Sequence, residues 1–252
     1  MTKGHHSPTG AWIAADFRDN LIIDRYDPVF ASMRAAKPKH LQSANSEDAV
    51  TWNVFRSLRQ IAPAVWLREL FGAAFPALRA PHGEHATVAV WQSVSPPPSL
   101  TVDLEEGDSE IDVVIEAPTW VWFVEAKLRG DISAGTATRR DLNQVLRYLD
   151  VGTYYAGVRP FYFSLLVADR ARSAVGAAAV AEYAELSRPR ELLADHRPDQ
   201  LRNLAGISLL TWAHLGEVLA DAAEDAPRED ERAYAARARD WLRGRGIIDR
   251  AG

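Results

Sequence analysis

The pattern of apolar and polar positions is most regular in residues 109–128, which read SEIDVVIEAPTWVWFVEAKL. Two runs rich in β-branched and aromatic residues flank Pro118 and Thr119, a composition typical of two antiparallel strands joined by a tight turn. A turn centred on these two residues sets Asp112 opposite Glu125, and Glu110 opposite Lys127. The pattern therefore predicts a hairpin with two carboxylates facing each other.

These facing carboxylates indicate a cation. Like charges directly opposite one another destabilise a sheet by a fraction of a kcal/mol to about 1 kcal/mol, so we expect something positive to lie between them. Glu125 and Lys127 also share one face, because side chains alternate along a strand. We expect Asp112, Glu125 and Lys127 to meet at one spot. The alternative is a surface hairpin in which Lys127 pairs with Glu110 and the other two acids are hydrated.

The remaining periodicity predicts helices before and after this hairpin. Ser46 is a good N-cap for an amphipathic helix that begins at Glu47. Further helical patterns cover residues 63–80, 141–150, 171–186, 214–222 and 229–245. Apolar runs predict strands at 87–91, 161–168 and 207–212. Together they predict an α/β fold with a core at 46–215, an N-terminal extension at 1–45, and a C-terminal helical segment at 216–252 packed on the core.

Composition narrows the class of protein. The 252 residues include no cysteine, which excludes disulfides and fits a reducing compartment. No apolar run is long enough for a membrane-spanning helix, and the N-terminus lacks the apolar core of a signal peptide. We therefore expect a cytoplasmic protein without membrane contact. Residues 1–45 are expected to pack on the core or to join two copies of the chain as a homodimer.

The net charge of −5 is not typical of a nucleic-acid-binding protein, but the distribution of charge matters more. Every charged residue from Thr101 to Glu125 is acidic, whereas basic residues outnumber acidic ones from Lys127 to Arg172. An acidic pocket beside a basic track suits phosphodiester chemistry. We expect the track to include Arg129, Arg139, Arg140 and Arg147; the alternative for each arginine is ordinary solvated surface charge.

The set Asp112 and Glu125-Ala126-Lys127 resembles the signature of the PD-(D/E)XK nuclease superfamily. Ile111 stands where the pattern has proline, a departure common among divergent relatives. Gln144 and Tyr148, four residues apart on the next predicted helix, are similar to the Gln-x-x-x-Tyr element of RecB-like members. The resemblance implies a restriction-endonuclease-like core in the order α-β-β-β-α-β, with a mixed sheet of four to five strands flanked by helices.

The resemblance also implies roles for these residues. Asp112 and Glu125, with the backbone carbonyl of Ala126, would bind Mg²⁺ or Mn²⁺, which prefer hard oxygen ligands. Lys127 would act on the attacking water or on the developing charge, as a cation rather than as a base. The helix before the sheet would supply a further acid, Glu47, with Asp48 as its competitor. Gln144 and Tyr148 would orient the water, Lys127 or a phosphate.

These features predict a magnesium-dependent nuclease, acting most readily on DNA and serving in restriction, repair or defence. The alternative is a catalytically inactive module with the same fold that binds nucleic acid or a protein partner. Motifs of other hydrolases, such as Gly-x-Ser-x-Gly or a phosphate loop, do not occur. His82 and His85 lie in a turn-like stretch without further spaced ligands, so zinc there is not favoured.

Overall fold

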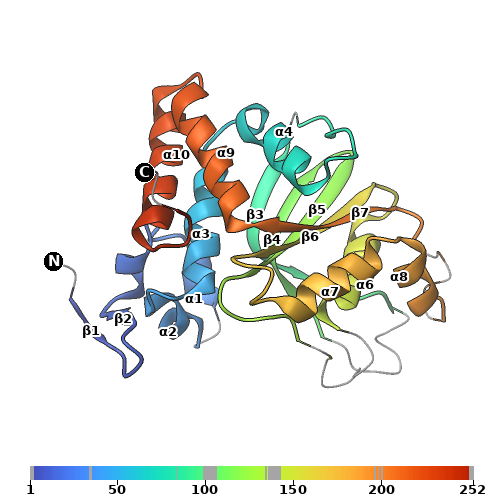
Figure 1. Cartoon of the computed structure of the whole chain (residues 1–252), viewed down its shortest axis with the longest axis horizontal. Coiled ribbons are helices and arrows are strands. Elements are labelled where there is room, and N and C mark those ends of the chain that lie inside the picture. The colour runs from blue at the N-terminus through green and yellow to red at the C-terminus, as the bar shows by residue number, and fades with distance from the viewer. Residues whose placement is uncertain are drawn as a thin grey trace.

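The computed structural model describes residues 3–33, 36–83, 85–98, 107–133, 135, 143–195, 197, 199 and 201–249. Its α/β architecture has a mixed five-stranded sheet flanked by helices and a separate two-stranded sheet near the N-terminus (Figure 1). The strands are β1 (Gly4–His6), β2 (Trp12–Ala14), β3 (Thr87–Val94), β4 (Ser109–Ala117), β5 (Trp120–Lys127), β6 (Phe161–Val167) and β7 (Leu204–Thr211). The α-helices are α1 (Val29–Ser32), α2 (Lys37–Gln42), α3 (Glu47–Leu58), α4 (Pro63–Ala74), α6 (Gln144–Ala156), α7 (Ala174–Tyr183), α8 (Ser187–Leu192), α9 (Trp212–Asp225) and α10 (Glu229–Gly244).

The large sheet has the strand order β3-β4-β5-β6-β7. β3, β4 and β5 are antiparallel neighbours, whereas β5, β6 and β7 run parallel. Helix α6 provides the crossover between β5 and β6, as parallel neighbours require. The strand predicted at 207–212 is therefore confirmed as the fifth member of the sheet.

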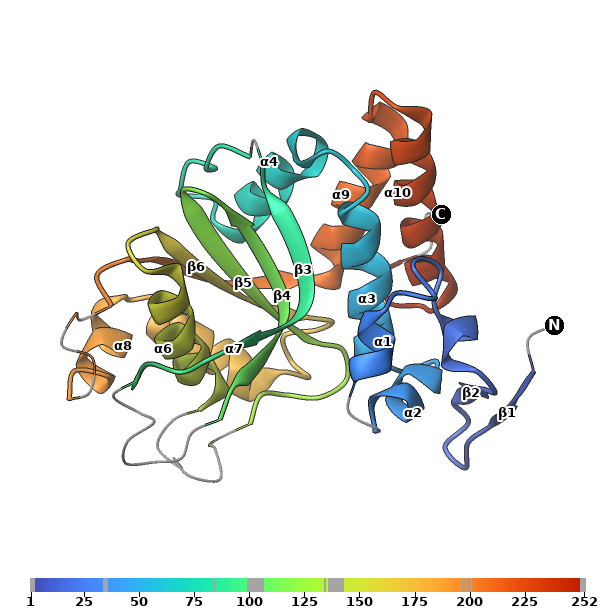
Figure 2. The same ribbon diagram turned by 180° about the vertical axis from the view of Figure 1, so that it is seen from behind.

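Two apolar cores cover the two faces of this sheet, because its buried strands present apolar side chains on both sides. Along β5, Trp122 and Val124 belong to a core shared with α3, α4, α9 and α10. Val121 and Phe123, which alternate with them, belong to a second core shared with α6 and α7. Figures 1 and 2 show these helix groups on opposite sides of the sheet.

The predicted hairpin is confirmed. Strands β4 and β5 are joined at Pro118 and Thr119, and their ladder runs from the Ala117–Trp120 pair to the Val113–Val124 pair. This is the register expected from a turn centred on those two residues. The N-cap at Ser46 is also confirmed, since its hydroxyl accepts a hydrogen bond from the Ala49 amide at 3.1 Å.

Several predicted helix boundaries were wrong. The helix predicted over 171–186 corresponds to α7 alone, which begins at Ala174 and ends at Tyr183; α8 is a separate short helix after the predicted range. The helix predicted from Asp141 begins at Gln144, where Asn143 is the N-cap; Asp141 itself lies outside the described residues.

The N-terminal segment packs on the sheet through α3. Leu21, Ile23 and Leu41 form a small core with Trp52 of α3 and Trp91 of β3. The β1–β2 hairpin lies beyond α2, away from the large sheet, in both views (Figures 1 and 2). None of the helices in the described ranges is long and apolar enough to cross a membrane.

The contact between α6 and β6 gives a direct test of the fold. A Cβ added to Gly152 of α6 would lie 2.1 Å from the Phe161 ring. We therefore expect Gly152→Ala to destabilise the protein by about 1–3 kcal/mol through overpacking, measured by urea unfolding. Gly72→Ala in α4 is the matched control, since its Cβ meets nothing within 4 Å. It should leave stability unchanged or raise it by about 0.4–1 kcal/mol; equal effects of the two variants would contradict the packing of α6.

Candidate active site

The candidate site lies where β4 and β5 separate. Beyond the Val113–Val124 pair the recorded ladder ends, and the side chain of Asp112 enters the space between the strands. Its Oδ2 accepts a hydrogen bond from the backbone amide of Ala126 at 2.9 Å. A carboxylate thus takes the place of a cross-strand carbonyl. The expected meeting of Asp112 with Glu125 therefore occurs at an opening in the sheet.

Glu125 is the most deeply buried acid of the site, with 3% of its surface exposed. Its Oε1 accepts hydrogen bonds from Lys127 Nζ and from Gln144 Nε2, both at 2.6 Å. Its Oε2 is also buried but has no hydrogen-bond partner among the described residues. Leaving a buried carboxylate oxygen without a partner is costly. This oxygen is therefore a candidate ligand for a cation.

The charge of Glu125 opposes the ionisation of Asp112. Burial, followed by the nearby charge of Glu125, raises the pKa of Asp112 well above its ordinary value. Burial also raises the pKa of Glu125, although Lys127 acts in the other direction. Carboxyls with raised pKa values favour a bound proton or a metal ion. The two buried carboxyls at the opening therefore favour a further bound cation, either a proton or a metal ion.

Lys127 remains a cation in this setting. Burial acts to lower its pKa, but the charges of Glu125, Glu47 and Asp112 outweigh burial, so its pKa is raised. Its Nζ lies 2.6 Å from Glu125 Oε1 and 3.7 Å from Glu47 Oε1. Glu125 and Lys127 therefore share one face, as the alternation along the strand predicted. A lysine with this pKa is unsuited to act as a base at neutral pH.

Glu47 reaches the site from the first turn of α3. Its Oε2 accepts a hydrogen bond from the Leu128 amide at 2.6 Å, and burial raises its pKa. The competing acid, Asp48, instead lies 3.5 Å from Lys37 Nζ. Of the two acids, Glu47 is thus the one beside Lys127. The N-cap at Ser46 fixes this position, because it sets where the first helical turn begins.

Helix α6 brings two further predicted residues to the site. Gln144 donates through Nε2 to Glu125 and also contacts the hydroxyl of Tyr148 at 3.1 Å. The Tyr148 hydroxyl donates to the backbone carbonyl of Glu110 at 3.3 Å. Burial, then the charges of Glu125 and Asp112, raise the pKa of Tyr148, so its hydroxyl stays protonated. Both side chains lie on the face of α6 directed to the hairpin, as the four-residue spacing predicted.

The expected facing of Glu110 and Lys127 was wrong. Glu110 pairs with Ser93 of β3, and its carboxylate binds Lys37 of α2. Lys37 also lies over the Trp91 ring, 4.1 Å from its centroid. The alternative in which Lys127 pairs with Glu110 is thus not the arrangement found. No pattern in the sequence indicated Lys37, because the segment that contains it has no readable periodicity.

Only part of the expected basic track lies within the described residues. Arg139 and Arg140 lie outside the described residues. Arg147 donates to the Gly107 carbonyl at 3.0 Å and lines a pocket of about 190 Å³ together with Gln144 and Tyr148. Arg129 is exposed and lines a different pocket of about 220 Å³.

The oxygen atoms at this opening are of the kind that a hard divalent cation prefers as ligands. Asp112, the unpartnered Oε2 of Glu125 and the backbone of Ala126 come together. Because the N–H and C=O of a strand residue point to the same side, the Ala126 carbonyl lies on the edge of β5 that faces Asp112. Within the described part of the chain, however, no group of three or more His, Cys, Asp or Glu side chains is arranged to hold a metal. A metal here would therefore rely on two acids, a carbonyl and water or substrate oxygens, as is usual for Mg²⁺.

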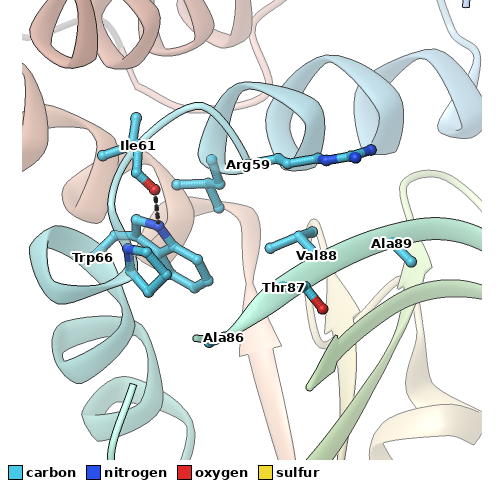
Figure 3. A pocket seen from close by; sticks show the side chains of 9 residues that line it. Arg59, Ile61, Trp66, Ala86, Thr87, Val88 and Ala89 are labelled. Atoms are coloured by element: carbon cyan, nitrogen blue, oxygen red, sulfur yellow. Dashed lines mark hydrogen bonds between the residues drawn. The ribbon is translucent and has the colours of Figure 1, made fainter. Parts of the chain in front are cut away.

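A larger pocket lies elsewhere and lacks these groups. About 370 Å³ in volume, it lies between the turn joining α3 to α4 and the start of β3 (Figure 3). The indole of Trp66 faces it and donates to the Ile61 carbonyl at 3.1 Å. Among its described lining residues, Arg59 is the charged one and none is an acid. Size alone would point to this pocket, but the chemistry points to the opening between β4 and β5.

Two histidines outside the site have structural roles. The His82 carbonyl accepts a hydrogen bond from the Trp120 indole at 2.9 Å, whereas Glu84, the acid between His82 and His85, lies outside the described residues. His214 accepts from the Thr211 amide at 3.2 Å and completes the cap of α9.

Comparisons with known proteins assign no family. No family model matches this sequence, and no curated protein matches it. The chain is similar to the crystal structure of a protein of unknown function, AF1548, at 15% identity and a TM-score of 0.21, covering 65% of this chain and 89% of that chain. A similarity at this TM-score carries no argument about fold or function.

Proposed function

We propose that this protein is a metal-dependent nuclease that hydrolyses phosphodiester bonds, with DNA as its substrate. The observation that carries the proposal is the convergence on Glu125. Its Oε1 accepts from Lys127 and Gln144, while its Oε2 is buried without a partner beside Asp112. Two acids, a cation and an amide from three separate elements would not be gathered this way for packing alone, because burying them is costly.

The order of elements supports a restriction-endonuclease-like core. Helix α3 is followed, after α4, by the antiparallel strands β3, β4 and β5, then by α6 and the parallel strand β6. This order is compatible with α-β-β-β-α-β. The two acids and the lysine lie on the second and third of these strands, the positions that the resemblance implies.

A bound Mg²⁺ or Mn²⁺ would neutralise charge on the attacking water and on the leaving oxygen. Asp112, Glu125 and the Ala126 carbonyl would hold it. Lys127, charged and held by Glu125 and Glu47, would stabilise the negative charge that develops on the phosphorus oxygens. Electrostatic stabilisation by a cation is strongest in a site that excludes water.

Gln144 and Tyr148 would position the acid rather than touch the phosphate. The Nε2 of Gln144 donates to both Glu125 and Tyr148, and its Oε1 accepts from the Ser133 amide at 3.3 Å. Tyr148 is in turn fixed to the β4 backbone at Glu110. This chain of hydrogen bonds holds the Glu125 carboxylate in one orientation, with Oε2 left for the cation.

A panel of divalent metals tests the proposal. Supercoiled, linear and single-stranded DNA, and RNA, would be incubated with wild type and with Asp112→Ala in Mg²⁺, Mn²⁺, Ca²⁺ or EDTA. We expect wild type to cut DNA in Mg²⁺ or Mn²⁺, and Asp112→Ala to be inactive. Absence of cleavage by wild type under every metal and substrate would contradict the proposal.

One observation favours a second function, a catalytically inactive module that binds nucleic acid. Among the described residues no three-acid metal group is found, and the ammonium of Lys127 already lies 2.6 Å from Glu125. Such a module would retain DNA with a salt-dependent affinity but would not cut it under any divalent metal. The same panel, combined with a binding measurement, separates the two functions.

A further inference from the structure

A second pocket adjoins the candidate site on the side away from α6. It has a volume of about 220 Å³ and is lined by the end of β5, the loop before α3, the loop after β6 and the turn after α10. Leu128 belongs to both features, since it lines the pocket and donates its amide to Glu47. The pocket and the candidate site are thus direct neighbours.

Arginines dominate the charge of this pocket. Arg129, Arg172 and Arg245 line it, and Asp169 is the acid among the lining residues. Arg129 and Arg172 are exposed, and neither makes a hydrogen bond or an ion pair that the described part of the chain shows. Asp169 already accepts from the Ala171 amide at 2.9 Å. The three guanidinium groups therefore outnumber the one carboxylate among the described lining residues, which gives the pocket a net positive charge.

Arg245 is the most enclosed of the three. It lies over the Trp241 ring, 4.9 Å from the centroid, and donates to the side-chain oxygen of Asn20 at 2.5 Å. Burial lowers its pKa. These neutral contacts fix the guanidinium in place without neutralising it, which leaves it ready for an oxyanion.

A further pocket that contains arginine also adjoins the site. Gln144, Tyr148 and Arg147 of α6 line the pocket of about 190 Å³. Glu125 thus contacts a residue of this pocket, Glu47 contacts a residue of the second pocket, and each pocket contains arginine. A nucleic-acid strand has a phosphate at every nucleotide, so a strand held at the acids must place its neighbouring phosphates to either side.

We propose that Arg129, Arg172 and Arg245 form a phosphate-binding subsite for the substrate strand, next to the phosphate that is cut. This inference rests on the proposed function, and it adds Arg172 and Arg245 to the binding surface. The chemistry recognised is a phosphate of the nucleic-acid backbone, either internal or at a strand end. Phosphate contacts of this kind position a strand without reading its sequence.

Fluorescence anisotropy of a labelled DNA duplex tests the subsite. Titrations in EDTA, so that cleavage cannot interfere, would be repeated between about 50 and 200 mM salt. We expect Arg172→Ala and Arg245→Ala each to weaken binding and to reduce the slope of log affinity against log salt by about 1. Arg170→Ala is the matched control, because Arg170 is exposed two residues away but does not line the pocket.

Arg172 decides the result, since its exposed side chain can be removed without loss of a described contact, whereas Arg245 also contacts Trp241 and Asn20. A slope for Arg172→Ala equal to that of Arg170→Ala would overturn the subsite, as would failure of wild type to bind DNA. If wild type cuts DNA but Arg172→Ala leaves the slope unchanged, the result supports the nuclease and contradicts the subsite. If Arg172→Ala reduces the slope but wild type does not cut DNA with any metal, the result supports phosphate binding at the subsite and contradicts the nuclease.

Duplexes with and without a 5′-phosphate identify the phosphate. An equal effect of Arg172→Ala on both assigns the subsite to an internal phosphate. A larger effect on the 5′-phosphorylated duplex assigns it to the end of the strand.

Discussion

Replacing Lys127 with alanine is expected to slow DNA cleavage by about 10²- to 10³-fold, the loss typical of removing one preorganised electrostatic group. The reason is that Lys127 is the cation held by Glu125 and Glu47 at the place where negative charge would develop. Lys127→Met should be equally impaired, although it keeps the apolar stem. Single-turnover cleavage in Mg²⁺ measures both variants.

The matched control is Lys39→Ala, which removes an exposed lysine of α2. It should cut at the wild-type rate. Thermal unfolding would show that the Lys127 variants remain folded. A folded Lys127→Met protein with wild-type cleavage would show that this lysine has no part in the reaction.

The second large effect is expected from Asp112→Asn, which should abolish cleavage and yet stabilise the protein in EDTA. Burial and Glu125 raise the pKa of Asp112 in the folded protein. A carboxyl with a folded pKa above its unfolded value destabilises the fold as pH rises through that interval. At pH 8 we therefore expect the variant to be more stable by about 1–2 kcal/mol, or to melt about 2–4 °C higher per kcal/mol.

This gain should shrink as pH falls and should vanish below the unfolded pKa, near 3.9, where Asp112 is protonated in both the folded and the unfolded protein. Mg²⁺ should raise the melting temperature of wild type but not of Asp112→Asn. Asp195→Asn, which changes an exposed acid away from the site, is the control and should behave as wild type. A variant that is less stable than wild type in EDTA at pH 8 would contradict the account of the buried acids.

The hairpin could be predicted because its information is local. The Pro118–Thr119 turn and two β-rich runs determine the register, and the register places Asp112, Glu125 and Lys127. The spacing of Gln144 and Tyr148 likewise needed only the period of one helix. Each of these residues lies within one element or one turn of the pattern that predicted it.

What the sequence did not predict depends on long-range packing. No local pattern indicates that Arg245 lies beside Arg129, because α9 and α10 must first pack against α3 and the sheet. The same is true of Lys37, which binds the carboxylate of Glu110 that was expected to face Lys127. The end of the ladder after Val113 and Val124 was also missed, since alternation along a strand assumes that pairing continues.

The central claim is that the opening between β4 and β5 binds a divalent metal. Crystals of wild type and of Asp112→Asn soaked in Mn²⁺ and measured for anomalous scattering test it most directly. We predict a peak in wild type, about 2.1 Å from oxygens of Asp112 and Glu125, and no such peak in the variant. The account would be contradicted if wild-type crystals showed no manganese peak at these acids and Glu125 contacted only Lys127 and Gln144.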